Sequence, residues 1–191
     1  MAIAFKEWAL VCEALGNGEQ SVILRKGGIA EGVVGFSFEH RDFYLFPTWF
    51  HGQVGKIRKE SLSLLEQAPA ELVLSFAATV EWSGMVADRD AVHRLEQLHV
   101  LDSSVIEERF EYGSGKDGGG YSHGGMGIHV AFVRVYRLEP PVNLPMEKSY
   151  GGCRSWVKLP EIEAEAMVSV LSDEEHGRRK ELFAQLLGIS I

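Results

Sequence analysis

The chain has 191 residues, of which 46% are hydrophobic, and this is enough to bury the core of one domain. Its formal net charge of −8 excludes a protein that binds polyanions over its whole surface, because such binding requires Lys and Arg to neutralise phosphates. No apolar run approaches the roughly 20 residues that span a bilayer, and two cysteines form neither a disulfide framework nor a zinc motif. We therefore expect a single cytoplasmic domain, residues 1–191, without a membrane segment.

The first half of the chain alternates between helical and strand-like patterns. Phe5 to Leu15 has apolar residues at helical spacing, which predicts an amphipathic helix ended by residues 16–18. Strands are predicted at 21–25, 33–38 and 42–46, with the last two forming a hairpin that Pro47 closes. Residues 53–67 predict another helix.

The second half contains the longest β-prone run, residues 71–82, which predicts a central strand. Helices are expected at 88–99 and 103–110, and a final helix is expected after its N-cap, Ser172. Residues 128–138 predict an interior strand that Pro140, Pro141 and Pro145 end. This irregular alternation excludes a doubly wound parallel sheet and predicts an α+β fold, with a mixed, mainly antiparallel sheet and four or five helices.

Residues 113–127 have eight glycines in fifteen positions and no apolar periodicity. Because little in this composition can compensate for the entropy lost on ordering, we expect a flexible loop within the domain.

Two segments concentrate residues that can carry chemistry. In residues 22–51, Arg25 and Lys26 precede the pair Gly27-Gly28, which permits close backbone approach to a ligand but also suits a hairpin turn. Residues 150–156 join a second glycine pair to a thiol, a guanidinium and an indole. No neighbouring base activates Cys153, which favours a buried thiol over a nucleophile.

The sequence resembles the prokaryotic family known as domain of unknown function 1802, over nearly its whole length and with the glycine-rich loop as an insertion. The resemblance is carried by Arg25, Lys26, Gly27, Gly28, Glu31, Phe46, Pro47, Thr48, His51, Tyr150, Gly151, Gly152, Cys153, Ser155 and Trp156. It implies no known activity. Because some members of that family are fused to restriction-type nucleases, it suggests an association with nucleic acid and restriction systems.

The first hypothesis is a nucleic-acid- or anion-binding module, with a sheet similar to the half-open barrel of PUA-like domains. Its predicted ligand-binding residues are Arg25, Lys26, Gly27, Gly28, Arg41, His51, Tyr150, Arg154, Ser155 and Trp156. The cations would contact phosphates on a local basic face, and Trp49 and Trp156 would either stack on bases or belong to the core. The two glycine-pair segments are then expected to meet at one surface.

The alternative is a metal-dependent phosphodiesterase of the restriction-nuclease type. Its candidate catalytic residues are Glu31, Glu39 and Asp42, with Lys26 or Arg41 stabilising phosphate charge. His40 and His51 are candidate metal ligands, although single histidines more often satisfy hydrogen bonds. A third hypothesis is a structural or interaction protein, and the sequence identifies no cofactor.

Overall fold

The structure is a computed structural model that describes residues 1–26, 36–58, 69–111 and 127–191. Seven strands in these residues form one sheet: β1 (Ala2–Trp8), β2 (Val22–Arg25), β3 (Asp42–Thr48), β4 (Glu71–Val86), β5 (Ile128–Pro145), β6 (Trp156–Leu159) and β7 (Ala166–Ser169). Their order is β2-β5-β4-β3-β1-β6, and β7 pairs with β5. Of the strand pairs in the described ranges, β1 with β3 is parallel and the others are antiparallel.

The same residues contain four α-helices and three short 3-10 helices. These are α1 (Ala9–Gly16), α2 (Arg89–Arg94), α3 (Ser103–Glu111) and α4 (Asp173–Leu187), with η2 (His51–Lys56), η3 (Leu95–Leu98) and η4 (Lys148–Tyr150). The predicted α+β fold, with its mixed and mainly antiparallel sheet, is confirmed. The predicted flexible loop at 113–127 lies outside the described residues except for Gly127.

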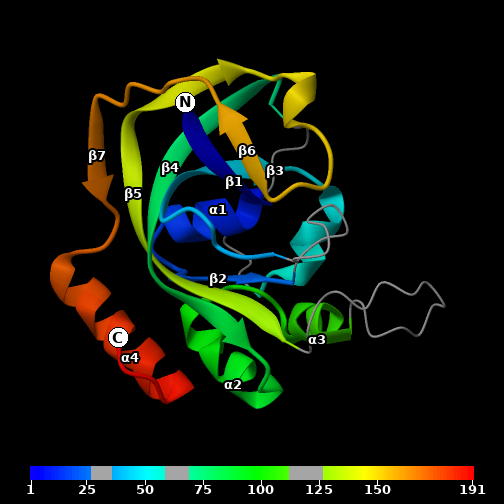
Figure 1. The fold of residues 1–191 in the computed structure, drawn as a ribbon, viewed down its shortest axis with the longest axis vertical. Coiled ribbons are helices and arrows are strands. Elements are labelled where there is room, and N and C mark those ends of the chain that lie inside the picture. Colours follow the sequence, from blue (N-terminus) through cyan, green and yellow to red (C-terminus); the bar gives the residue numbers. More distant parts are fainter. Residues whose placement is uncertain (27–35, 59–68, 112–126) are drawn as a thin grey trace.

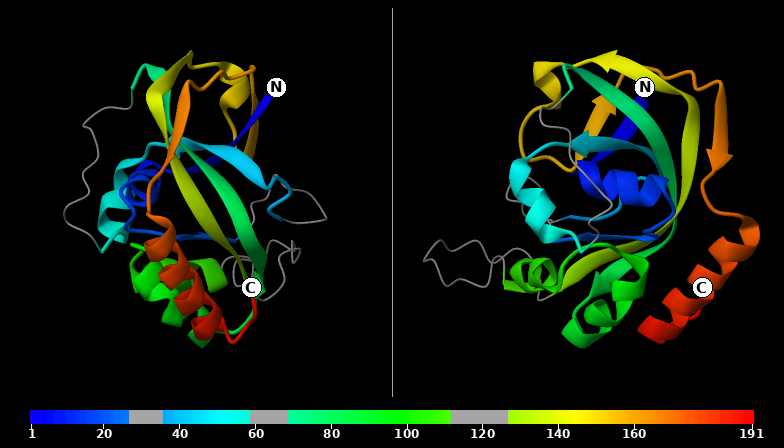
Figure 2. Two further views of the ribbon diagram at one scale, coloured as in Figure 1. Left: turned by 90° about the vertical axis from the view of Figure 1, so that its left-hand side faces the viewer. Right: turned by 180° about the vertical axis from the view of Figure 1, so that it is seen from behind.

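The sheet is strongly curved, because β4 and β5 are long strands that bend around α1 (Figure 1). Helices α2, α3 and α4 gather at one end of the molecule, and the N-terminus lies toward the other end (Figure 2). The largest core cluster includes Phe5, Phe132 and Phe183, and the second includes Phe46 and Leu74. The curved sheet therefore has packed side chains on both faces, so buried positions do not follow a simple alternation.

The predicted helix from Phe5 to Leu15 is wrong in its first part. Residues Ala2–Trp8 form β1, and the chain turns directly into α1 at Ala9. Pairing with β3 on one side and β6 on the other satisfies the backbone of β1, so tertiary pairing overrides the local helical spacing. As a strand, this segment places Lys6 and Glu7 in buried positions, with exposed fractions of 9% and 2%.

The start of α1 is stabilised by a residue from a distant segment. Trp8 occupies the N-cap position without a side-chain cap. The backbone N–H of Leu10 instead donates to Oε1 of Gln53 in η2, at 3.1 Å. The amide group of Gln53 is completely buried and donates to the carbonyls of Thr48 and Phe50, which fixes it in place.

Two further predictions in this region are wrong in the parts that the structure describes. Residues 36–40 form no strand, so they make no hairpin with β3, and residues 33–35 lie outside the described ranges. The start of the helix expected at 53–67 is occupied by η2, after which Ile57 is extended and bridges to Leu101, and residues 59–67 lie outside the described ranges. Arg58 follows and donates to three backbone carbonyls, so its side chain anchors an extended segment rather than a helix.

Strand β5 continues through the prolines that were expected to end it. The pairing register between β4 and β5 shifts between Leu74 and Phe76, and Pro140 and Pro141 fall in this irregular stretch of β5. At a bulge, a residue without an N–H costs no ladder hydrogen bond, which is why the strand tolerates both prolines.

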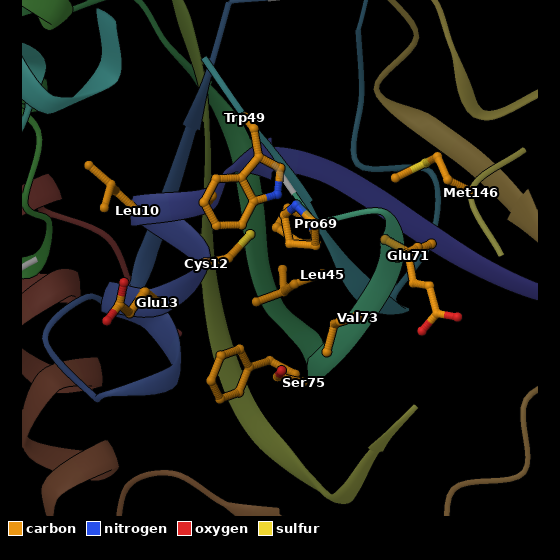
Figure 3. A pocket seen from close by; sticks show the side chains of 14 residues that line it. Leu10, Cys12, Glu13, Leu45, Trp49, Pro69, Glu71, Val73, Ser75 and Met146 are labelled. Atoms are coloured by element: carbon orange, nitrogen blue, oxygen red, sulfur yellow. The ribbon is translucent and has the colours of Figure 1, made fainter. Parts of the chain in front are cut away.

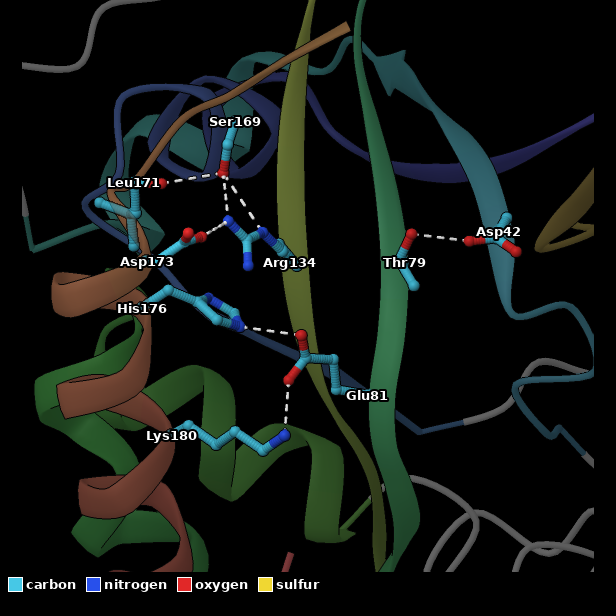
Figure 4. Close-up of polar contacts among 9 residues, drawn as sticks. All are labelled: Asp42, Thr79, Glu81, Arg134, Ser169, Leu171, Asp173, His176 and Lys180. Atoms are coloured by element: carbon cyan, nitrogen blue, oxygen red, sulfur yellow. Dashed lines mark hydrogen bonds and ion pairs between the residues drawn. The ribbon is translucent and has the colours of Figure 1, made fainter.

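Helix α4 is attached to the sheet by ionic contacts (Figure 4). Glu81 of β4 contacts Nε2 of His176 at 3.0 Å and Nζ of Lys180 at 2.9 Å. Arg134 of β5 pairs with Asp173 at the start of the helix. The predicted N-cap is confirmed, because the hydroxyl of Ser172 accepts from the Glu175 N–H at 3.2 Å. Farther along the sheet, Thr79 donates to Asp42 at 2.6 Å, which joins β4 to β3.

We expect Glu81→Gln to destabilise the protein by about 1–3 kcal/mol at pH 7, because two partners lose their carboxylate and His176 is only 6% exposed. Chemical denaturation measures this change. The matched control is Glu174→Gln, whose ion pair with Arg178 is at the surface, and its effect should stay within about 0.5 kcal/mol.

The acid dependence of the Glu81 variant follows from the pKa of the carboxyl. Burial alone would raise the pKa of Glu81, but hydrogen bonds from Lys180 and His176 lower it overall. Because the pKa of Glu81 is lower in the folded than in the unfolded state, its ionised carboxylate stabilises the fold at pH values above the unfolded pKa. This stabilisation is lost as the pH falls through the folded pKa. The difference between wild type and Glu81→Gln should therefore disappear in acid; a difference that persists there would show that Glu81 acts without its charge.

Candidate functional site

Lys6 lies near the end of β1, beside the second glycine-pair segment. Its backbone N–H donates to the carbonyl of Ser155 at 2.8 Å, and its Nζ donates to the carbonyl of Gly152 at 3.0 Å. The ammonium also lies 5.7 Å from the centre of the Phe46 ring. These contacts hold a largely buried amino group at the point where the chain enters β6.

Arg25 reaches the same segment from the end of β2. Its Nη2 donates to Oγ of Ser155 at 2.9 Å, and its Cζ lies 5.7 Å from the centre of the Phe5 ring. Ser155 is only 1% exposed, so it serves as a fixed acceptor for the guanidinium. Residues 25 and 155 are thus neighbours in the fold although 130 positions separate them.

The cations of this region are close enough to influence one another. Burial lowers the pKa of Lys6, Arg154 and Arg25 lower it further, and only Cys153 acts in the opposite direction. Each neighbouring positive charge disfavours the protonated ammonium. Arg154 and Cys153 are exposed beside Lys6, so the prediction of a buried Cys153 thiol is wrong.

A further cation and two aromatic rings continue the site along β1. Arg109 of α3 lies with its Cζ 5.4 Å from the centre of the Trp8 ring, and it donates to the carbonyl of Leu24. Burial lowers the pKa of Arg109; the carboxylate of Glu7 opposes this shift and Arg25 adds to it. The Trp8 ring packs edge-on against Phe50, with ring centres 5.2 Å apart, and Phe50 is 42% exposed.

We name Lys6, Arg25, Arg109 and Arg154 the basic cluster. Within the described ranges, none of these four residues forms an ion pair with a carboxylate, whereas Arg58, Arg89, Arg134 and Arg178 all do. The buried Glu7 lies near Arg109, and its Oε1 accepts from the Trp8 N–H at 2.8 Å. Positive charge held together with so little compensation favours the binding of an anion.

The other predicted binding residues are dispersed. Lys26 donates to the carbonyl of Gly127 at 3.1 Å, Arg41 and His51 are exposed, and Tyr150 is buried against Phe46. Trp156 packs against Phe5 and Phe43, with ring centres 4.9 and 5.2 Å away, so much of its indole belongs to the core. Gly27, Gly28 and Glu31 lie outside the described residues.

The candidate catalytic and metal-binding residues form no common centre in the described part of the chain. Asp42 accepts the hydrogen bond from Thr79, Glu39 is exposed, and His40 packs edge-on against Trp156 at 5.0 Å. No group of three or more His, Cys, Asp or Glu side chains in the described residues is arranged to hold a metal ion.

Sequence reasoning missed Lys6, Trp8, Phe50 and Arg109. The first two were assigned to a helix, in which Lys6 would face solvent. Treating AIAFKEW as a strand would have placed Ala4, Lys6 and Trp8 on one face, which was the available signal. Arg109 had no such signal, because its position depends on how α3 packs beside β2.

The fold and the site define a class of protein: an α+β protein with a basic cluster at the end of a parallel pair of strands. The chain belongs to the family described as domain of unknown function (DUF1802), whose model matches residues 4–182. No curated protein matches the chain. No helix in the described ranges is long and apolar enough to cross a membrane.

Three solved structures resemble the chain, all of ASCH from Zymomonas mobilis. The protein itself has a TM-score of 0.45 and 12% identity, covering 95% of this chain and 94% of that chain. One single-substitution mutant has a TM-score of 0.44 and 12% identity, and the match covers 95% of each chain. A second mutant has a TM-score of 0.46 and 14% identity, and the match covers 84% of this chain and 91% of that chain. At these TM-scores the resemblance carries no argument, so the PUA-like barrel stays a prediction. Neither the family description nor these structures connects the chain with a restriction system.

We expect Lys6→Met to stabilise the protein at pH 7 by about 1 kcal/mol, because it replaces a desolvated cation, surrounded by other cations, with an apolar side chain of similar length. Because burial lowers the pKa of Lys6 in the folded state, its charged form reduces the free energy of unfolding at neutral pH. This cost disappears as the pH rises above the pKa of the unfolded state. Urea denaturation at neutral and alkaline pH measures both effects.

The control for this variant is Lys158→Met on β6, an exposed position at which we expect a change within about 0.5 kcal/mol. If Lys6→Met destabilised the protein by more than the control does, the hydrogen bond from Lys6 to Gly152 would stabilise the fold. The charged ammonium would then not reduce the stability of the protein.

Proposed function

We propose that this chain is a nucleic-acid-binding module in which the basic cluster contacts a phosphate of a single strand. The observation that carries this proposal is the gathering of Lys6, Arg25, Arg109 and Arg154 without ion-pair partners in the described residues. A phosphate would provide the missing negative charge. Arg is suited to this role because its planar guanidinium donates two parallel hydrogen bonds to phosphate oxygens.

The aromatic residues beside the cluster support a nucleic acid over a simple anion. Phe50 is a large apolar side chain with 42% of its surface exposed, and it packs against Trp8, which in turn lies under Arg109. Proteins that bind single strands combine cations for the backbone with aromatic faces on which bases stack. Phe50 is the residue to which we assign stacking.

The rigidity of the site also supports binding. Arg25 is held by the buried hydroxyl of Ser155, and Lys6 by the carbonyl of Gly152, so both cations have a fixed position before a ligand arrives. Ordering a free side chain on binding costs about 0.5–1.5 kcal/mol, and a side chain that is already held avoids much of this cost.

No observation favours the phosphodiesterase alternative, since the described carboxylates share no metal-binding arrangement. We also do not extend the proposal to restriction systems, because no described residue points to one. The net charge of −8 limits binding to the local cluster, so we expect modest affinity with a strong dependence on salt.

The direct test is binding of a fluorescent single-stranded RNA or DNA of about 10 nucleotides, measured by anisotropy over a range of salt concentrations. We expect Arg25→Ala and Arg154→Ala each to weaken binding and to reduce the slope of log K against log salt by about one. The matched control is Arg178→Ala on α4, whose surface pairs with Glu174 and Glu175 lie away from the cluster, and it should leave the slope unchanged.

Phe50→Ala separates nucleic acid from other anions. We expect it to weaken oligonucleotide binding by about 1–3 kcal/mol and to leave the binding of inorganic polyphosphate unchanged, because only the oligonucleotide has bases to stack. Equal losses for both ligands would contradict stacking, and wild-type affinity in both arginine variants would refute the proposed site.

A further inference from the structure

A cavity of about 290 Å³ lies between α1, the end of β3 and the start of β4 (Figure 3). This volume is at the lower end of the roughly 300–1,000 Å³ that is usual for small-molecule sites. Its walls include Leu10, Leu45, Phe76 and Met146, and the indole of Trp49 covers one side above Cys12. The cavity is therefore an apolar pocket with one large aromatic face.

The pocket is separate from the basic cluster. Leu45 and Pro47 of β3 line it, whereas Phe46 between them packs beneath the ammonium of Lys6. Successive residues of a strand point to opposite faces, so the pocket and the ammonium of Lys6 lie on opposite sides of β3, and none of the four cations of the basic cluster lines the pocket. A ligand in this pocket would not contact the cations of the proposed nucleic-acid site.

The charged residues of the pocket are both acidic. Glu13 of α1 and Glu71 of β4 stand at opposite sides of it, and no Lys, Arg or His in the described residues lines it. Among those same residues, neither carboxylate has a hydrogen-bond or ion-pair partner. Burial and the nearby Glu19 raise the pKa of Glu13, as expected for a carboxylate that lacks a cation.

The thiol in the pocket wall is not a nucleophile. Cys12 is 4% exposed, its Sγ lies 3.9 Å from the carbonyl of Glu7, and burial raises the pKa of the thiol well above its usual value. A neutral buried thiol behaves as a small apolar group. The pocket thus offers apolar contact, an aromatic face and negative charge at its edges.

We propose that this pocket binds a small organic cation, in which an ammonium or guanidinium group is attached to a compact apolar or aromatic body. The apolar body fits against Leu45, Phe76 and Trp49, and the cation lies at one edge, beside the carboxylate of either Glu13 or Glu71. An indole face attracts a cation in addition to the carboxylates. Among the described residues, an anionic ligand would meet two carboxylates and no compensating cation.

Three probes of nearly equal shape test this proposal: 2-phenylethylamine, neutral 2-phenylethanol and anionic 3-phenylpropionate. Binding is followed at pH 7 by calorimetry and by the indole N–H signal of Trp49 in NMR spectra. We expect the amine to bind on the order of fivefold more tightly than the alcohol, and the acid to bind more weakly than both. The signal of Trp49 should shift with the amine.

Glu13→Gln keeps the size of the side chain and removes its charge, so it should reduce the preference for the amine over the alcohol. The matched control, Glu163→Gln, changes an exposed residue outside the pocket and should leave this preference unchanged. Trp49→Leu should weaken binding of the amine about fivefold. If that variant fails to fold, Glu13→Gln and Glu71→Gln still decide the question.

Equal affinity for the three probes would overturn the proposal, as would a preference for the amine that survives both glutamine substitutions, or no binding at millimolar concentrations. The amine should leave oligonucleotide affinity unchanged. Loss of amine binding in the Arg25 or Arg154 variants would also contradict the assignment, because it would place the amine near the basic cluster.

Discussion

The pairing of β1 with β6 determines where this molecule holds its positive charge. The register places Phe5 opposite Trp156. Lys6, which follows Phe5, and Ser155, which precedes Trp156, therefore meet where the two strands separate. Arg25 then has an acceptor in Ser155, and Lys6 has one in Gly152. Without this pairing, Lys6 and Arg25 would not meet the segment that carries Arg154.

The parallel pair of β1 and β3 separates two electrostatic environments. On one side, Lys6 lies over Phe46, and the nearby Arg154 and Arg25 lower its pKa; on the other, Leu45 and Pro47 face a pocket whose charged residues, among those described, are acids. The acidic overall charge of the chain is therefore compatible with a local basic site.

Much of the fold could be predicted from the sequence, because β2, β4, β5 and α4 carry strong local patterns. Residues 71–82 are rich in β-formers, and Ser172 followed by acids is a clear helix start. In contrast, residues 2–8 have a helical spacing that pairing with β3 and β6 overrides, and β7 has only four residues, which is too short for a recognisable pattern. Local patterns identify elements whose conformation their own residues favour. They fail where pairing with a partner strand determines the conformation.

The same distinction applies to the site. Arg25, Arg154 and Ser155 were recognised because they adjoin glycine pairs, whereas Lys6 was hidden by the helical assignment of its segment. Tyr150 and Trp156 were named for their chemistry, but their surroundings place them largely in the core. Residue type identifies what a side chain can do, and only packing decides whether its polar or aromatic face reaches solvent.

The cap that Gln53 provides for α1 has a consequence for how the chain folds. Helix α1 has only eight residues, which is too short for stability on its own, and its first turn depends on an amide 43 positions away in the chain. Helices are usually among the earliest elements to form, but α1 requires a long-range contact. Formation of α1 is thus coupled to closure of the chain between residues 10 and 53.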